Sequence, residues 1–186
     1  MTESALGKPL RLLAISGSLR KSSTNTAALE ALARLAPHDI RVDLYRDLAR
    51  LPPFNPDDDA EDIARPAAVE AFRDRIATSD AIVIAAPEYA HGIAGALKNA
   101  LDWLVASETF AGKPVALINA APRAFHAQAA LREVLSTMAA RLIPEASANL
   151  PLTGKVVVAD DILSDPRLTR RLTDALDALA AALRSG

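Results

Sequence analysis

The segment with the clearest chemical potential lies between a short apolar run, residues 10–16, and a stretch with helical spacing. It begins with Gly17, which permits a sharp turn, and then collects hydroxyl, amide and basic side chains: Ser18, Arg20, Ser22, Ser23, Thr24 and Asn25. Backbone N–H groups at a helix N-terminus favour an anion, and hydroxyls and a guanidinium bind phosphate oxygens. The same residue types also form ordinary helix caps. From its composition alone, this segment could equally be a phosphate-binding site or a simple helix cap.

Several competing motifs are missing from this segment. Its one glycine matches neither the G-x-G-x-x-G dinucleotide fingerprint nor the phosphate loop that ends in G-K-[ST]. Ser18 does not stand in a G-x-S-x-G elbow, so a hydrolase nucleophile is disfavoured. The chain has no cysteine, which excludes thiolate nucleophiles, cysteine-based zinc sites and iron–sulfur clusters. Any redox chemistry must therefore come from a bound cofactor.

A second polar segment follows the apolar run 80–86. It reads Pro87-Glu88-Tyr89-Ala90-His91-Gly92 and leads into a helical stretch that contains Lys98, Asn99, Asp102 and Trp103. A loop histidine is commonly a surface residue, but for His91 we favour a pocket location, whereas His126 is more typical of a helix start. Neither histidine has the i, i+4 partner of a zinc ligand set, so no metal site is expected. The acidic stretch 57–62 lacks the spacing of a calcium loop and is expected to be solvated.

Alternating apolar runs and helical patterns predict the elements that position these segments. Strands are expected over 10–16, 40–45, 80–86 and 115–120, with a short fifth strand within 142–150. Helices are expected after each of the first four strands, and the last begins at Pro166 after Asp165. The fold class is α/β, with residues 1–186 forming a single domain around a five-stranded parallel sheet. Such sheets bind ligands beyond the carboxyl ends of their strands, where the strand order reverses, so chemistry is expected in the loops after strands one, three and four.

The bulk composition excludes some partners. The 21 basic and 23 acidic residues give a net charge of −2 and are scattered without a basic block, so nucleic acid is not an expected partner. The N-terminus shows neither the basic start nor the apolar stretch of a signal peptide, and no run is long and apolar enough to cross a membrane. We therefore expect a cytoplasmic protein without a membrane partner.

Taken in order, the segments 17–25 and 87–103 resemble the NADPH-dependent FMN reductase family, which includes flavodoxin-like quinone, azo-dye and chromate reductases. The resemblance covers roughly residues 10–150. It implies a flavodoxin-like three-layer sandwich, FMN as the bound cofactor, NAD(P)H as the reductant, and a homodimer or homotetramer with the flavin near a subunit boundary. Family members often read Pro-Glu-Tyr-Asn-Tyr-Ser-x-Pro-Gly in the second segment, and this chain departs from that pattern at Ala90, His91, Gly92 and Ala94.

The resemblance also implies site residues. The FMN phosphate is expected to be surrounded by Ser18, Arg20, Ser23, Thr24 and Asn25. The isoalloxazine ring and ribityl chain are expected to contact Pro87, Glu88 and Tyr89, and the loop that starts at Ala120 is expected to close over the ring, with His91 nearby. Arg123 is open to two readings, a contact with a phosphate of the nicotinamide nucleotide or a solvated or subunit-contacting arginine.

The resulting hypothesis is an oxidoreductase in which NAD(P)H passes hydride to bound FMN, and the reduced flavin passes electrons to a quinone, flavin, azo compound or similar small acceptor. No protein acid or base is required for the hydride transfer, so no catalytic residue is assigned. A non-enzymatic flavodoxin-like electron carrier is the alternative, although ordinary flavodoxins tend to be strongly acidic. A third alternative is a domain that kept the fold and lost the flavin.

Overall fold

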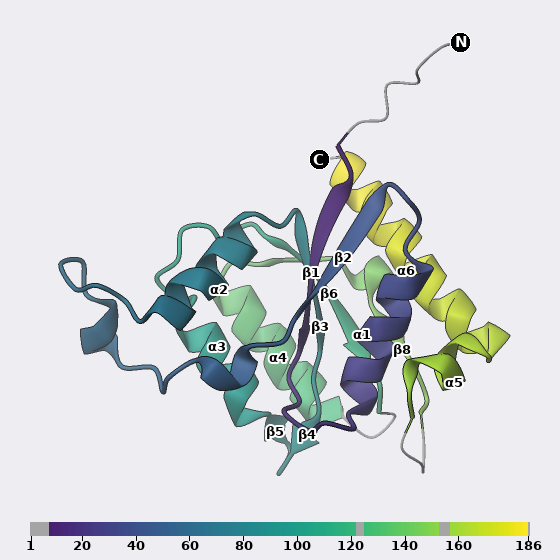
Figure 1. Cartoon of the computed structure of the whole chain (residues 1–186), viewed down its shortest axis with the longest axis horizontal. Helices are drawn as coiled ribbons and strands as arrows, with labels where there is room; N and C mark the ends of the chain where they lie inside the picture. The colour runs from purple at the N-terminus through teal and green to yellow at the C-terminus, as the bar shows by residue number, and fades with distance from the viewer. Residues whose placement is uncertain (1–7, 122–124, 153–156, 186) are drawn as a thin grey trace.

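The computed structural model describes residues 8–121, 125–152 and 157–185, and its centre is a parallel sheet (Figure 1). The four main strands are β1 (Leu10–Ser16), β2 (Ile40–Tyr45), β3 (Ala81–Ala85) and β6 (Pro114–Asn119). They are ordered β2-β1-β3-β6, and every pairing between them is parallel. The chain therefore moves outward from β1 to β2, and then crosses back to place β3 on the other side of β1. The strand order reverses between β1 and β3.

The expected fifth strand is divided into two short pieces. They are β7 (Arg141–Leu142) and β8 (Ala148–Asn149), which both pair in parallel with β6. Between them, a 3-10 turn, η3 (Pro144–Ala146), leaves the sheet, because proline has no N–H to donate to a ladder. The Ser147 hydroxyl accepts a hydrogen bond from the Leu117 backbone N–H at 3.1 Å, so a side chain replaces the missing strand at this point.

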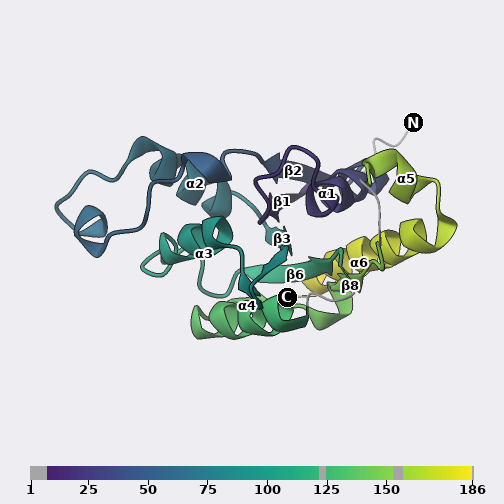
Figure 2. The ribbon, with the colours of Figure 1, turned by 90° about the horizontal axis from the view of Figure 1, so that it is seen from below.

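Helices cover both faces of the sheet, as Figure 2 shows from below. One face is covered by α1 (Thr24–Leu35), α5 (Ala159–Leu163) and α6 (Pro166–Arg184), and the other by α2 (Ala67–Ala77), α3 (Gly95–Asp102) and α4 (Phe125–Thr137). Along β1, Leu12 and Ala14 pack on the first face, while Leu13 and Ile15 pack on the second, as the alternation of a strand requires. The fold is a flavodoxin-like three-layer sandwich. No helix in the described ranges is long and apolar enough to cross a membrane.

The helix starts show how the local sequence sets the boundaries. The side chain of Asp165 accepts from the Arg167 backbone N–H at 2.8 Å, and Pro166 is the first residue of α6, as predicted. The short helix α5 and the 3-10 turns η1 (Leu48–Arg50) and η2 (Pro56–Asp59) were not predicted, since each is too brief to show a helical period.

The acidic stretch projects from the body of the molecule beside α2 (Figure 1), but one of its aspartates is not solvated. The side chain of Asp59 is only 5% exposed and forms ion pairs with Arg65 and, at 2.7 Å, with Arg73. Arg73 in turn donates to the Trp103 backbone carbonyl at 2.6 and 2.9 Å. The expectation of a wholly solvated acidic loop was therefore wrong for Asp59, which ties this loop to α2 and to the end of α3.

Replacing Asp59 with asparagine is expected to destabilise the fold by about 2 kcal/mol near neutral pH, because two partly buried guanidinium groups lose their anionic partner. Burial alone would raise the pKa of Asp59, but hydrogen bonds from Arg65 and Arg73 outweigh it and hold the pKa below its ordinary value. This contribution is therefore present above the ordinary carboxyl pKa of about 4 and is lost as the pH falls below it. Urea unfolding at about pH 7 and about pH 3 should show the difference between wild type and variant shrinking in acid. The exposed Asp57→Asn is the control, and an equal effect of the two substitutions would contradict the assignment.

Candidate functional site

The loop after β1 is held tightly against the rest of the sheet. The Gly17 backbone N–H donates to the Ala85 carbonyl at 2.8 Å, so the loop leaves β1 next to the end of β3. The Ser23 side chain accepts from the Thr26 backbone N–H at 3.3 Å and caps α1. The prediction of a helix cap in this segment is therefore confirmed for Ser23. The capped N-terminus of α1 lies near the carboxyl ends of β1 and β3.

A cavity of about 360 Å³ opens at this end of the sheet, within the size range of small-molecule sites. We refer to it as the main cavity, and its lining residues are Ser18, Arg20, Ser22, Ser23, Thr24, Asn25, Pro87, Glu88, Tyr89, Ala120, Ala121 and Leu152. The loops after β1, β3 and β6 thus contribute together, at the point where the strand order reverses. Every residue predicted to contact the cofactor lines this cavity except His91. Ser22 and Ala121 belong to the two loops that were predicted to surround the cofactor, whereas Leu152 was not predicted.

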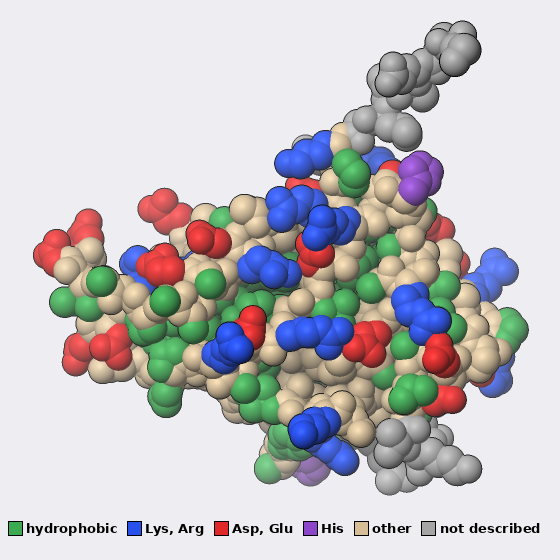
Figure 3. Space-filling model, in the orientation of Figure 1, with side chains coloured by type: hydrophobic (Ala, Val, Ile, Leu, Met, Phe, Trp, Pro, Cys, Tyr) green, Lys and Arg blue, Asp and Glu red, His purple; other side chains and the backbone are tan. Residues whose placement is uncertain are grey.

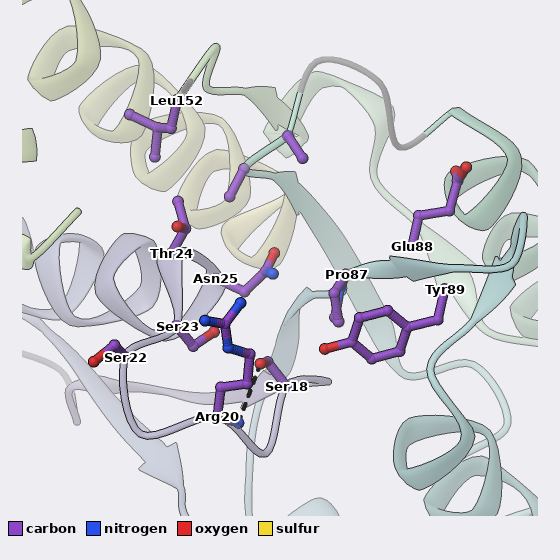
Figure 4. Close-up of a pocket in the computed structure, with 12 residues that line it drawn as sticks. Ser18, Arg20, Ser22, Ser23, Thr24, Asn25, Pro87, Glu88, Tyr89 and Leu152 are labelled. Carbon is purple, nitrogen blue, oxygen red and sulfur yellow. Dashed lines mark hydrogen bonds between the residues drawn. The ribbon is translucent and has the colours of Figure 1, made fainter. Parts of the chain in front are cut away.

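One end of the main cavity has the character of an anion cradle (Figure 4). The Arg20 side chain extends toward Asn25 and Ser23, and the Arg20 backbone N–H donates to the Ser18 hydroxyl at 3.4 Å. Asn25 is only 7% exposed, and its Oδ1 has no hydrogen-bond partner among the described residues. Buried amide groups are normally hydrogen-bonded, so Asn25 Oδ1 indicates a place where a ligand could bind. Because Asn25 Oδ1 can only accept, a ligand hydroxyl fits it as donor, while a phosphate fits the Arg20 guanidinium and the N-terminus of α1.

The other end of the main cavity is built from backbone and from Tyr89, whose ring points back from its strand toward Ser18 (Figure 4). The carboxylate of Glu88 accepts a hydrogen bond from the Ala127 backbone N–H at 2.9 Å, in the first turn of α4. A carboxylate at a helix N-terminus is favoured by the helix dipole. The Glu88 carboxylate thus links the segment after β3 to the first turn of α4.

A two-stranded hairpin carries Tyr89, and the sequence did not predict it. It pairs β4 (Glu88–Tyr89) with β5 (Gly92–Ile93), and its two turn residues, Ala90 and His91, have φ values of 48° and 58°. Turns of this kind normally use asparagine or glycine, because other residues are strained with positive φ. Strain of this sort is retained most often at functional sites.

His91, in the hairpin turn, is not among the residues that line the main cavity. Its ring stacks on that of His126, with centroids 4.3 Å apart and an interplanar angle of 27°. His126 is the second residue of α4, as its helix-start reading predicted, and it also contacts Phe125. Both histidines are exposed. A contact of His91 with the cofactor thus remains a prediction from the sequence, and Arg123 lies outside the described residues.

The polar residues of the helical stretch 98–103 hold a neighbouring loop. Asn99 accepts from the Phe54 backbone N–H at 2.7 Å and donates to the Pro52 carbonyl at 2.9 Å. Trp103 donates from Nε1 to the same carbonyl at 2.8 Å, and Phe54 meets its ring edge-on at 5.0 Å. Asn99 and Trp103 therefore bind a neighbouring segment of the same chain.

Gly17 is required by close packing beneath the main cavity. A Cβ added there would lie 3.0 Å from Leu97 Cδ2 and 3.3 Å from Pro87 Cδ, whereas a Cβ on Gly95 would meet nothing within 4 Å. We expect Gly17→Ala to destabilise the fold by about 1–3 kcal/mol and to weaken cofactor binding, because it moves the Pro87 segment. Gly95→Ala, in the first turn of α3, is the matched control and is expected to be neutral or to stabilise by up to about 1 kcal/mol. Urea unfolding tests both, and equal effects of the two substitutions would contradict this account.

Together, the sheet order, the cradle at the N-terminus of α1 and the cavity at the reversal point define a flavodoxin-like protein built to hold a phosphorylated ligand. The family model described as NADPH-dependent FMN reductase matches residues 10–154. The chain belongs to this family.

Relatives and solved structures agree with the assignment. The chain is 40% identical over 131 residues to an NAD(P)H-dependent FMN reductase of Pseudomonas aeruginosa, which covers 68% of this chain and 69% of that protein. It is 37% identical over 112 residues to a quinone reductase of Escherichia coli K12, which covers 59% of each. It is also similar to the structure of FerB, a flavoenzyme NAD(P)H:acceptor oxidoreductase from Paracoccus denitrificans, with a TM-score of 0.81 and 28% identity over 95% of this chain and 98% of that one. The matched segment is thus less than two thirds of the Escherichia coli relative.

Proposed function

We propose that this chain is a single-domain FMN-dependent oxidoreductase that uses NAD(P)H to reduce a quinone, a flavin, an azo compound or a similar small acceptor. The observation that carries the proposal is the main cavity at the reversal point of the sheet. Arg20 lies there at the N-terminus of α1 with Asn25, whose Oδ1 has no partner in the described part of the chain. When bound, FMN would accept a hydride from NAD(P)H and pass its electrons to the acceptor.

The residues after β1 would bind the phosphate and the sugar alcohol of FMN. Arg20 supplies a fixed positive charge, the hydroxyls of Ser18 and Thr24 supply hydrogen bonds, and the N-terminus of α1 adds its dipole. Asn25 Oδ1, which has no partner among the described residues, would accept a hydrogen bond from a hydroxyl of the sugar alcohol. These contacts anchor the cofactor and leave its reactive ring to the loops after β3 and β6.

At the other end of the main cavity, the protein would position the flavin ring and shield it from water. Pro87, Tyr89, Ala120 and Ala121 line the cavity there, and the Glu88 carboxylate holds the hairpin of β4 and β5 against α4. Backbone amides at the ends of strands can donate to the polar edge of a flavin and tune its electronics. No side chain is assigned as a catalytic acid or base.

Steady-state turnover tests the proposed activity. Under anaerobic conditions, the chain loaded with FMN should oxidise NADPH or NADH continuously only when benzoquinone, free FMN, an azo dye or ferricyanide is present. The same protein stripped of flavin is the control, and it should show no turnover with benzoquinone, an azo dye or ferricyanide. Absence of turnover with all of these acceptors would reject the reductase, and it would favour an electron carrier or a domain without redox function.

We further propose a cytoplasmic homodimer or homotetramer with the flavin site near a subunit boundary. The support is the exposed apolar surface beside the main cavity, where Tyr89 is 52% exposed and Phe125 is 63% exposed. Exposed patches of this kind are typical of interaction sites. Light scattering on the eluting protein should give a mass that is a multiple of the chain mass, and a monomer mass would reject the assembly.

A further inference from the structure

A second cavity, of about 230 Å³, lies on the other side of the loop that follows β1. We call it the basic cavity. It is bounded by the carboxyl ends of β1 and β2, the first turn of α1 and η1, with Ala14, Ser16, Leu44, Tyr45 and Leu48 among its lining residues. Its cationic lining side chains are Arg20, Lys21 and Arg46, and no carboxylate of the described residues lines it. An opening of this size with three cations suits an anionic group.

The basic cavity adjoins the main cavity across the loop that follows β1. The two share Ser18 and Arg20 as lining residues. A third hollow, of about 300 Å³, shares Arg20 and Tyr89 with the main cavity, and Leu19 and Arg20 with the basic cavity. Neighbouring hollows thus follow one another from Tyr89 past Leu19 to Lys21 and Arg46. Figure 3 shows basic side chains over the loop at the lower end of β1, in the orientation of Figure 1.

The charges around the basic cavity leave two cations for a second anion. The Arg20 side chain extends into the main cavity, toward Asn25 and Ser23 (Figure 4). Arg46 is paired with Glu30 of α1 at 3.0 Å, and both side chains are more than a third exposed. Exposed pairs of this kind are weak, so a more highly charged anion can displace the carboxylate. The other nearby acid, Asp47, is paired with Arg50 at 3.2 Å.

We propose that the basic cavity binds the 2′-phosphate of NADPH, with Lys21 and Arg46 as the residues that distinguish NADPH from NADH. The proposal rests on the proposed function, which requires a nicotinamide ring near the flavin. The opposite end of the same molecule carries the 2′-phosphate, which is the only difference between the two nucleotides. Its charge is close to −2, so an ammonium and a guanidinium from different elements suit it. The hydroxyls of Ser16 and Thr26, themselves 2.8 Å apart, add polar groups to the lining.

Direct binding tests the assignment without relying on turnover. Calorimetric titration of the FMN-loaded full chain with 2′,5′-ADP and with 5′-AMP should show at least about tenfold tighter binding of 2′,5′-ADP, which is about 1.4 kcal/mol. Lys21→Ala and Arg46→Ala should each remove about tenfold of that preference. Arg41→Ala is the matched control, because Arg41 lies at the start of β2 and pairs with Asp43. Equal binding of the two nucleotides, or an equal loss in the control, would overturn the assignment.

A variant that binds 2′,5′-ADP more tightly separates a direct effect on the basic cavity from misfolding, because a misfolded protein would only lose affinity. Glu30→Gln removes the carboxylate that competes for Arg46, so 2′,5′-ADP should bind a few times more tightly, while 5′-AMP binding stays the same. In turnover, Arg46→Ala should lower the ratio of kcat/KM for NADPH to that for NADH about tenfold. If the protein turns over but this ratio is unchanged in the variant, the basic cavity is not the 2′-phosphate site. If no turnover occurs but 2′,5′-ADP binds as described, the proposed function fails and the nucleotide site stands.

Discussion

Replacing Arg20 with alanine is expected to weaken FMN binding about 30-fold while changing riboflavin binding less than about twofold. The two ligands differ only in the phosphate, and the Arg20 side chain extends into the phosphate end of the main cavity. A hydrogen-bonded charge pair contributes about 1.5–3 kcal/mol, and about 2 kcal/mol corresponds to a 30-fold change in affinity. Quenching of flavin fluorescence on titration gives both dissociation constants.

The control for this substitution is Arg34→Ala, which removes an arginine from the far end of α1, where it pairs with Asp160 on the surface. It should leave both ligands bound as in the wild type. An equal loss of FMN and riboflavin in Arg20→Ala would mean that the substitution disturbs the whole site. An unchanged ratio with no loss would place the phosphate elsewhere.

Replacing Trp103 with alanine is expected to destabilise the fold by about 3–5 kcal/mol, the largest effect on stability that we predict. The side chain is fully buried, packs edge-on against Phe54, and donates its N–H to the Pro52 carbonyl at 2.8 Å. Its loss leaves a large cavity and frees the loop that Asn99 also holds. Urea unfolding measures the difference directly.

A graded comparison separates the packing of Trp103 from its hydrogen bond. Trp103→Phe keeps much of the ring volume and loses the N–H, so it should cost about 1–3 kcal/mol and fall between wild type and alanine. Val105→Ala is the surface control, because Val105 is 66% exposed, and it should change stability by less than about 0.5 kcal/mol. If Trp103→Ala behaved like this control, the clamp on the loop would have no energetic role.

The main strands of the sheet could be predicted because their patterns are local. β1, β3 and β6 are short apolar runs bounded by turn residues, and their burial follows the pattern. The break between β7 and β8 could not be read in advance, since it depends on Pro144 leaving the sheet and on Ser147 reaching Leu117. The hairpin of β4 and β5 could not be predicted from the sequence for a different reason. Its turn uses Ala90 and His91, where the usual signal is asparagine or glycine.

In the candidate site, too, local features could be predicted from the sequence, whereas contacts between distant segments could not. The residues predicted to bind the phosphate are contiguous in sequence, so they could be named together, and they line one cavity in the structure. Leu152 and the bond from Ala127 to Glu88 join segments far apart in the chain, and a periodic pattern contains no signal for such contacts. Asp59 was misread because an aspartate in an acidic, proline-rich loop shows nothing of the two arginines that bury it.

The central claim is that NAD(P)H reduces FMN bound in the main cavity, and one anaerobic stopped-flow measurement tests it most directly. The FMN-loaded full chain is mixed with NADPH, and the visible absorbance of the oxidised flavin is followed without any acceptor present. The account predicts that the absorbance is lost in a single turnover and returns when a quinone is added. A flavin that stays oxidised in excess NADPH and NADH would contradict the account.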